Sequence, residues 1–198
     1  MTTIEFFFDV GSPYSYLAAT QVPALAERTG AEVRWRPFLL GGVFKAAGND
    51  MPARVPAKAR WMLADLAANA AHLGVPFRMN SHFPVSTLAA QRALVAAESQ
   101  FGPEVVPTFA MVLFRAMWVE DRDVSVGDEL AACAAEAGLE VARLTPHVQS
   151  DETKARLKEI TEEAVSRGAF GAPTFFVGQQ MFFGHDRLFL VEEAAGGS

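Results

Sequence analysis

The sequence contains one cysteine, Cys133, in 198 residues. A single cysteine cannot form an intramolecular disulfide, and it excludes any Cys-x-x-Cys motif for redox or zinc chemistry. Cys133 falls on the apolar face of a predicted helix, where a cysteine is typically a small core residue. If this protein carries out sulfur chemistry, another molecule supplies the sulfur.

Long apolar runs and an excess of positive charge are also missing. No uninterrupted apolar stretch approaches the ~18 residues that span a bilayer. Glu5 and Asp9 stand where a signal peptide has a basic and then an apolar stretch. The net charge of −6 argues against nucleic-acid or anionic-membrane partners, which need clustered Lys and Arg. We therefore expect a cytoplasmic protein without membrane or nucleic-acid partners, in which any anion site is local.

Two catalytic motifs are absent, Gly-x-Ser-x-Gly and His-Glu-x-x-His. The histidines lie in no recognisable hydrolase motif and do not pair with carboxylates at metal-ligand spacing. They are His72, His82, His147 and His185. A nucleophilic serine needs a base held close to it. The sequence therefore disfavours a serine hydrolase, and we expect no metal.

The first forty residues predict a strand, a helix and a second strand. Residues 4–8 are rich in β-forming residues, and Ser12 with Pro13 forms the N-cap and N1 pair of a helix. Pro23 lies inside that helix and should kink or break it. Residues 32–38 then alternate apolar and charged side chains, which is typical of a strand with one buried face.

The other end of the chain predicts a helix over 151–167, two short aromatic strands over 174–177 and 181–183, and a last helix that begins near Asp186. Between the two ends, 43–149 shows helical periods and almost no strand signal.

This order predicts an α/β fold in which a thioredoxin-like sheet is interrupted by an all-helical insertion. The thioredoxin-like domain would comprise residues 1–42 and 150–198, and the helical insertion residues 43–149.

The turn at Ser12 stands where a redox-active thioredoxin has Cys-x-x-Cys. A helix N-terminus presents free N–H groups and the positive end of the dipole, which stabilise an anion. A thiol has a pKa near 8.5. Lowering that pKa by about two units requires the thiolate to be stabilised over the thiol by about 2.7 kcal/mol. One hydroxyl hydrogen bond plus the helix end is of that order. Ser12 is thus a candidate to hold a borrowed thiolate, or simply an N-cap, while Ser15 is interpreted as structural.

Two further turns each allow two interpretations. Pro173 is either the first residue of an edge strand or a cis-proline that leaves the backbone of Ala172 free to pair with an extended peptide ligand. Asp186 is either the N-cap of the last helix or, with His185, part of a second anion site for a carboxylate.

Four motifs occur in order and together cover nearly the whole chain. They are FFDVGSPYSYL at residues 7–17, GNDMPARVPAK at 48–58, GAPTF at 171–175 and FGHDRL at 183–188. The set resembles the 2-hydroxychromene-2-carboxylate isomerases and their relatives, the kappa-class glutathione transferases.

The resemblance implies a DsbA-like thioredoxin fold, a homodimer and glutathione as the cofactor. By this analogy Ser12 is the catalytic residue, which hydrogen-bonds the glutathione sulfur and favours the thiolate. The other implied glutathione contacts are Tyr14 at the helix start, Asn49 at the start of the insertion, Ala172 opposite the cysteinyl backbone, and His185 with Asp186 at the γ-glutamyl end.

Arg54 and Lys58 lie close in sequence to Asn49, and their charge alone makes them candidates to bind a substrate carboxylate. Each of them is equally interpreted as a solvated basic residue. Four aromatic residues could form a wall of the site, although core positions are the better interpretation. These residues are Phe38, Phe44, Trp61 and Phe83. We expect Gly11 to make the loop before Ser12 flexible.

The activity that the resemblance implies is a cis–trans isomerisation in aromatic degradation. The small aromatic carboxylate 2-hydroxychromene-2-carboxylate opens to a conjugated acid, and a thiolate that adds to it lets the double bond rotate to trans-o-hydroxybenzylidenepyruvate before the thiolate leaves. A moderately lowered thiol pKa suits this role, because nucleophilicity falls with pKa. Two alternatives stay open. One is a kappa-type glutathione transferase, and the other is a redox-inactive thioredoxin-fold module that binds peptides at the Pro173 edge.

Overall fold

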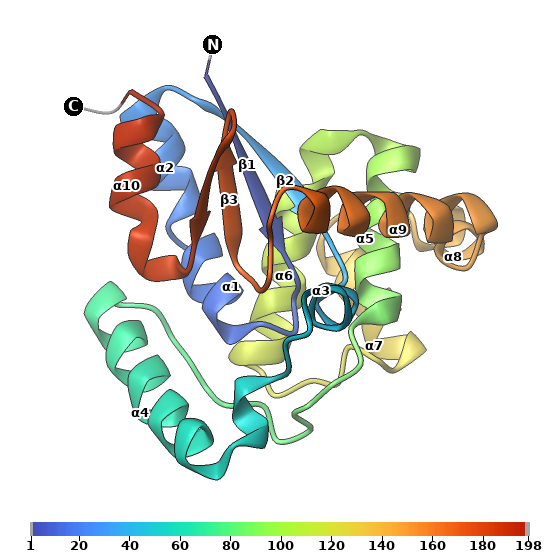
Figure 1. Cartoon of the computed structure of the whole chain (residues 1–198). Helices are drawn as coiled ribbons and strands as arrows, with labels where there is room; N and C mark the ends of the chain where they lie inside the picture. Colours follow the sequence, from blue (N-terminus) through green and yellow to red (C-terminus); the bar gives the residue numbers. More distant parts are fainter. Residues whose placement is uncertain (1, 197–198) are drawn as a thin grey trace.

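A four-stranded mixed sheet lies at the centre of the computed structural model, which describes residues 2–196 (Figure 1). The strands are β1 (Thr3–Phe8), β2 (Glu32–Pro37), β3 (Thr174–Val177) and β4 (Gln180–Phe183), in the order β2-β1-β3-β4. β1 pairs in parallel with β2 and antiparallel with β3, and β3 and β4 form a hairpin. The two ends of the chain therefore build one sheet, which confirms the predicted thioredoxin-like α/β class.

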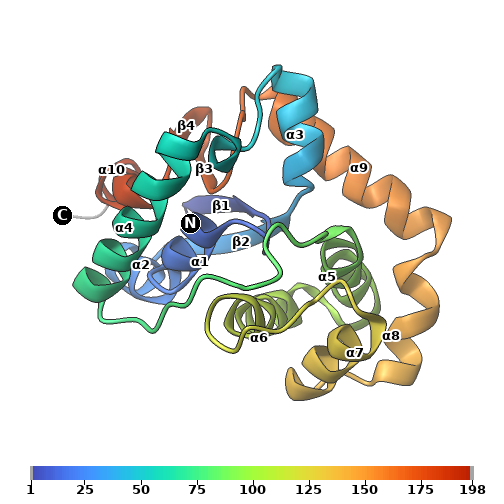
Figure 2. The ribbon, with the colours of Figure 1, turned by 90° about the horizontal axis from the view of Figure 1, so that it is seen from below.

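Helices cover both faces of this sheet (Figure 2). The first five are α1 (Pro13–Ala19), α2 (Val22–Thr29), α3 (Leu40–Ala47), α4 (Pro56–Leu73) and α5 (Leu88–Phe101). They are followed by α6 (Val106–Trp118), α7 (Gly127–Glu136), α8 (Val141–Val148), α9 (Asp151–Ser166) and α10 (Leu188–Ala194). Short 3-10 helices are η1 (Pro52–Arg54), η2 (Pro103–Val105) and η3 (His185–Arg187). Between β2 and α9 the described chain is helical or irregular, as the sequence predicts.

Successive side chains of β1 enter two separate hydrophobic clusters. Phe6 and Phe8 join the larger cluster, which includes residues of α1, α2 and α6, and Phe6 stacks on Phe175 at 4.8 Å between ring centroids. Phe7 points to the opposite face, where it meets Phe176 edge-on at 5.5 Å and packs with residues of α9. Side chains alternate between faces along a strand. Because both faces are covered, three consecutive phenylalanines are all buried.

The helix predicted to follow Ser12 is in fact two helices. α1 ends at Ala19, and α2 begins at Val22 with Pro23 in its first turn. Pro23 has no N–H to continue the ladder of α1, but the first turn of a new helix tolerates it. The expected break at Pro23 is therefore confirmed. Gly30 ends α2 with a left-handed φ of 62°.

α4 presents much of its apolar surface to solvent. Leu66 and Ala70 are its buried residues, whereas Trp61 is 63% exposed. The core interpretation is therefore wrong for Trp61, because α4 packs on α1 and η1 along one side only. It is correct for Phe38, which is fully buried. No helix in the described chain is both long enough and apolar enough to cross a membrane.

Gln91 of α5 is a fully buried amide that joins the ends of two strands. Its Nε2 donates to the carbonyl oxygens of Phe8 and Phe38, at 2.9 and 2.8 Å. Its Oε1 accepts from the Val10 N–H at 3.4 Å. Buried backbone groups need partners, so this side chain attaches the helical block to the edge of the sheet from which the Ser12 turn begins.

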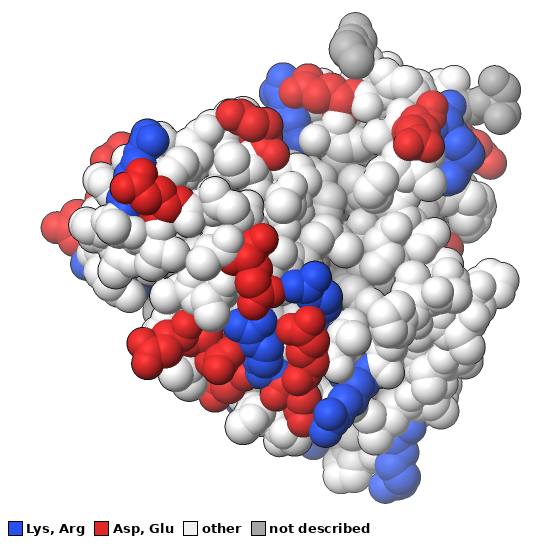
Figure 3. Space-filling view, turned by 180° about the vertical axis from the view of Figure 1, so that it is seen from behind, with Lys and Arg blue, Asp and Glu red and all other residues white. Residues whose placement is uncertain are grey.

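Charged side chains on the back of the molecule lie in groups of both signs (Figure 3). Ion pairs among α6, α7 and the segment between them show the same pattern: Arg122 of that segment binds Glu129 at 2.6 Å and Glu136 at 2.7 Å, and Arg115 also binds Glu136. A single ion pair at an exposed surface contributes little to the free energy of unfolding. Together these pairs neutralise much of the local charge.

The buried amide of Gln91 generates a prediction about stability. Gln91→Met keeps the side-chain length but removes the donor to the Phe38 carbonyl, while the Phe8 carbonyl keeps its bond from the Phe38 N–H at 3.0 Å. We expect the free energy of unfolding to fall by about 1–3 kcal/mol, measured as a lower urea midpoint at an unchanged slope. Gln179→Met, on the exposed hairpin turn, is the control and should change stability by less than about 0.5 kcal/mol. Equal midpoints for the two variants would contradict the role given to Gln91.

Candidate functional site

Ser12 makes hydrogen bonds on both sides of the candidate site. Its N–H donates to the Asp9 carbonyl at 2.9 Å. Its Oγ accepts from the Ser15 N–H at 3.1 Å, which makes Ser12 the N-cap of α1, and its hydroxyl donates to the Ala172 carbonyl at 3.2 Å. The side chain is buried, with 4% of the residue exposed. One oxygen thus serves both as the cap of α1 and as a hydrogen-bond link from Ser12 to the loop before β3.

The N-terminus of α1 offers few free amides to an anion. Pro13 has no N–H, and the Ser15 N–H is used by Ser12. α1 is also only seven residues long, so it sums few peptide dipoles. Any stabilisation of a thiolate here would therefore depend more on the Ser12 hydroxyl than on the helix end.

Asp9 is a buried carboxyl that anchors this turn. One of its oxygens accepts from the Gly11 N–H at 2.9 Å and the other from the Leu40 N–H at 2.8 Å, and the Thr87 hydroxyl binds it as well. Burial raises the pKa of Asp9 above its ordinary value, and the three hydrogen bonds oppose that rise. Asp9 therefore ties the turn to the start of α3 and to Thr87, which precedes α5.

Gly11 provides close packing rather than the flexibility that we expected. A Cβ at this position would lie 2.9 Å from the Thr87 methyl carbon and 3.4 Å from an Asp9 oxygen. Its N–H is also held by Asp9. A larger residue would push the turn away from Thr87, so the glycine allows the two segments to approach each other.

A cavity of about 600 Å³ opens beside Ser12, within the range of small-molecule sites. Its apolar wall includes Leu39, Leu40, Phe44, Met51, Met62, Phe83, Val85, Leu88, Phe170 and Phe183. Among the described residues that line it there is no Lys, Arg or His, and Asp9 is the one carboxylate. The cavity therefore suits an apolar body and offers no cation to a substrate.

Four predicted glutathione contacts line this cavity, namely Ser12, Tyr14, Asn49 and Ala172. The Ala172–Pro173 peptide bond is cis, which agrees with the second of the two interpretations of Pro173. The Asn49 side-chain amide donates to the Phe170 carbonyl at 3.1 Å. Asn49 thus links the segment after α3 to the loop that leads to Ala172.

Tyr14 is held between α4 and η3. Its hydroxyl donates to Asp65 at 2.8 Å, and its ring stacks on that of His185 at 5.1 Å. Burial raises the pKa of Tyr14, and the Asp65 carboxylate raises it further. The phenol therefore stays protonated and continues to donate, so Tyr14 is both a wall of the cavity and a structural link.

His185 and Asp186 lie outside the lining of the cavity, although His185 contacts Tyr14. Burial lowers the pKa of His185, so the imidazole is neutral near pH 7. Its Nε2 is buried and has no partner in the described chain. Asp186 binds Arg187 at 2.7 and 2.8 Å within η3. The prediction that Asp186 caps the last helix is wrong, because α10 begins only at Leu188 and has no side-chain cap.

The structure does not bring Arg54 and Lys58 to the cavity. Arg54 pairs with Asp50 at 2.9 Å, and the two side chains are 71% and 61% exposed. Lys58 is exposed near the start of α4. Neither residue lines the cavity. Their binding of a substrate carboxylate stays a prediction that these contacts do not support.

Sequence reasoning gave no functional role to Asp9, Asp65 or Thr87, which fix the walls of the site. For Asp9 a signal was present, because an acid directly after an apolar strand is costly to bury unless it has partners. For Asp65 there was none, because a charged residue within a helical segment is usually exposed to solvent. Its bond to Tyr14 spans 51 positions and appears only once the chain has folded.

The chain is similar to known proteins over nearly its whole length. The family model of the DSBA-like thioredoxin domain matches residues 3–196. A 2-hydroxychromene-2-carboxylate isomerase of Sphingobium xenophagum is 35% identical over 192 residues, which is 96% of each chain. Human glutathione S-transferase kappa 1 is 31% identical over 210 residues, covering 98% of this chain and 91% of the relative. A solved structure of a 2-hydroxychromene-2-carboxylate isomerase matches with a TM-score of 0.86 at 27% identity, covering 98% of this chain and 94% of that one.

The raised pKa of Asp9 predicts how stability depends on pH. The folded state binds the proton of the Asp9 carboxyl more tightly than the unfolded chain does. The contribution of this proton to the free energy of unfolding is therefore complete below the ordinary pKa of 3.8, and it is lost as pH rises through the pKa of the folded state. We expect the free energy of unfolding of the wild type, relative to Asp9→Asn, to fall as pH increases over that range. Urea unfolding of both proteins at a series of pH values measures the difference.

Glu192→Gln is the matched control for that series. Arg28 lowers the pKa of the half-buried Glu192, so the wild type should gain stability relative to this variant as pH rises through the ordinary carboxyl range. The two variants are thus expected to give slopes of opposite sign. A slope of the Glu192 sign for Asp9→Asn would show that folding lowers the pKa of Asp9.

Proposed function

The chain belongs to the DSBA-like thioredoxin domain family, and from that premise we propose that it is a glutathione-dependent isomerase of 2-hydroxychromene-2-carboxylate-type substrates. The observation that carries the proposal is the buried Ser12 hydroxyl, which meets the Ala172 carbonyl at the wall of an apolar cavity. Glutathione would supply a thiol that adds to the conjugated double bond and leaves again, so that it is not consumed.

The residues around the cavity fit a thiol-containing peptide. Ala172 presents its backbone at the cavity wall two residues before β3 begins, where an extended ligand can pair as a short strand. The orphan Nε2 of His185 is a buried polar atom next to Tyr14 that lacks a partner, and a polar group of the ligand would satisfy it. Asp186 is the acid proposed for the ligand's amino end.

Ser12 would exchange one hydrogen-bond partner when a thiolate is present. A hydroxyl has a single hydrogen, and Ser12 now donates it to Ala172 over 3.2 Å, which is long for an O–H···O bond. A charged acceptor makes the stronger bond, so the hydroxyl would turn to the sulfur while its oxygen keeps the Ser15 N–H. The Ala172 carbonyl would then be free to accept an N–H from the bound peptide.

A second candidate function is a kappa-type glutathione transferase that acts on an uncharged aromatic electrophile. The absence of Lys, Arg and His from the described cavity lining favours it, because nothing there neutralises a carboxylate. The redox-inactive peptide-binding module predicts no reaction with either substrate.

Several further predictions from the sequence stay proposals. These are the homodimer, the cytoplasmic location, the role in aromatic degradation and the division into a thioredoxin-like domain (1–42 and 150–198) and a helical insertion (43–149). The helical residues between β2 and α9 support the division.

The role of Ser12 predicts a shift in thiol ionisation. In the complex with glutathione, Ser12→Ala should raise the pKa of the bound thiol by about one unit, equivalent to about 1.4 kcal/mol, because the thiolate loses its hydroxyl donor. Ultraviolet thiolate absorbance across pH measures this. Ser15→Ala is the control, because the Ser15 hydroxyl is buried without a partner in the described chain and its removal should leave the curve unchanged. If wild type and Ser12→Ala ionise alike, the role given to Ser12 is wrong.

Measuring the thiol concentration during turnover distinguishes the two candidate reactions. With 2-hydroxychromene-2-carboxylate, the proposed isomerase should form trans product only when glutathione is present, and the thiol concentration should stay constant. With a neutral activated aryl halide, a transferase should consume one thiol per product, because conjugation retains the sulfur. Conversion of the chromene that is independent of glutathione would overturn the proposed function, and thiol loss with only the neutral substrate would favour the transferase.

A further inference from the structure

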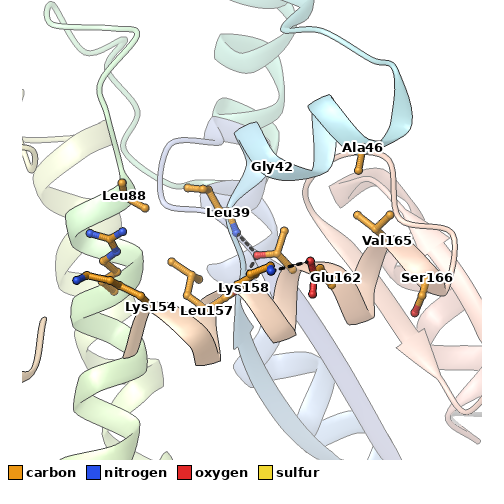
Figure 4. Close-up of a pocket in the computed structure, with 12 residues that line it drawn as sticks. Leu39, Gly42, Ala46, Leu88, Lys154, Leu157, Lys158, Glu162, Val165 and Ser166 are labelled. Carbon is orange, nitrogen blue, oxygen red and sulfur yellow. Dashed lines mark hydrogen bonds and ion pairs between the residues drawn. The ribbon is translucent and has the colours of Figure 1, made fainter. Parts of the chain in front are cut away.

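A second cavity, of about 440 Å³, lies between α3, α5 and α9 (Figure 4). It shares only Leu39 and Leu88 with the cavity at Ser12, so these two side chains form a common wall. We call it the α9 groove. None of the residues predicted to bind glutathione or substrate lines it.

The walls of the α9 groove are mostly apolar. α9 contributes Leu157 and Val165, and α3 contributes Gly42 and Ala46 from the opposite side. Residues 154, 157, 158, 161, 162, 165 and 166 of α9 all line the groove, which is the spacing of a single helix face. Leu157 is buried, whereas Ala46 is exposed at the edge of the groove. This volume and lining are typical of a site for a small organic molecule.

Three basic side chains line the groove. They are Arg92, Lys154 and Lys158, against one lining acid, Glu162. Arg92 donates to the neutral Gln149 at 2.8 Å, and its buried Nε has no hydrogen-bond partner in the described chain. This local excess of positive charge occurs in a protein with a net charge of −6.

The ion pairs of the two lysines leave them available to a ligand. Lys154 pairs with Asp151, whose side chain is fully exposed, and Lys158 pairs with Glu162 at 3.6 Å with both side chains largely exposed. Exposed pairs of this kind are worth little, because water competes for each charge. A carboxylate held close to Arg92 would be less solvated and would supply the acceptor that the buried Nε lacks.

We propose that the α9 groove binds a small amphipathic carboxylate, with its apolar body between α3 and α9 and its anionic end at Arg92 and Lys154. Charge complementarity selects this ligand. A neutral apolar molecule leaves the buried Arg92 nitrogen unsatisfied, and a simple inorganic anion leaves the apolar walls exposed to water. The site is separate from the proposed reaction site, so it can exist whether or not glutathione binds at Ser12.

Isothermal titration of the full-length protein with 2-naphthoate, and with the neutral 2-naphthamide as a matched probe, tests the proposal. Arg92→Met should weaken naphthoate binding by about tenfold, the size of one lost charge-assisted bond, and should leave the naphthamide affinity nearly unchanged. Ala46→Phe should block both probes by filling the edge of the groove. Ala47→Phe, one residue further along α3 and also exposed but outside the groove, should bind both probes like the wild type.

A second variant guards against misfolding of Arg92→Met. Lys154→Met with Lys158→Met changes only exposed side chains and should also weaken naphthoate binding selectively. Unchanged naphthoate affinity in all of these variants would overturn the proposal, because it would place the probe in the Ser12 cavity. Sedimentation analysis gives the other contrary outcome. If the wild type is an oligomer that Ala46→Phe dissociates, and if naphthoate binds only to dissociated chains, the groove is an interface between copies of the chain.

Discussion

The carboxyl of Asp9 is the contact on which the geometry of the Ser12 turn depends. It accepts from Gly11 and Leu40 and binds Thr87, so it joins the end of β1, the start of α3 and the residue before α5. Gln91, one turn further along α5, holds the neighbouring backbone. Buried polar groups of this kind are stable only as a complete set, since removing one leaves another unpaired. The helical block is therefore part of the site, because it fixes the position of Ser12.

Without a cysteine at the turn, the protein controls charge near Ser12 with hydrogen bonds alone. Burial disfavours any anion there, and only the Ser12 hydroxyl and a short helix end oppose this cost. No cation lines the cavity in the described chain, and Asp9 adds a like charge when it is ionised. For a thiolate bound as proposed, these opposing effects limit how far its pKa is lowered. A modest shift suits reversible addition, because a sulfur with a very low pKa is a poor nucleophile.

The elements that the sequence predicted correctly are those specified by neighbouring residues. The apolar run of β1, the alternation in β2, the break before Pro23 and the hairpin of β3 and β4 all follow from short patterns. Contacts between distant segments could not be predicted this way. The carbonyl of Phe8 is 83 positions from Gln91, and Tyr14 is 51 from Asp65. Trp61 shows the converse. A large aromatic residue in a helical segment predicts a core position, but whether it is buried depends on how closely α4 packs on its neighbours, which the local sequence does not contain.

The two cavities on either side of Leu39 and Leu88 differ in the charge of their lining residues. The cavity at Ser12 combines an apolar wall with hydrogen-bond donors and no cation, whereas the α9 groove combines an apolar wall with three basic side chains. A charged group is costly to move from water into an apolar site unless an opposite charge meets it. The two cavities therefore differ in the charge that they favour: neutral groups lose less hydration in the Ser12 cavity, and a carboxylate bound as proposed would regain a partner in the α9 groove. The shared wall keeps the two environments distinct, because Leu39 is fixed by the bond from its N–H to Thr161 at 3.0 Å, and Leu40 beside it is held by Asp9.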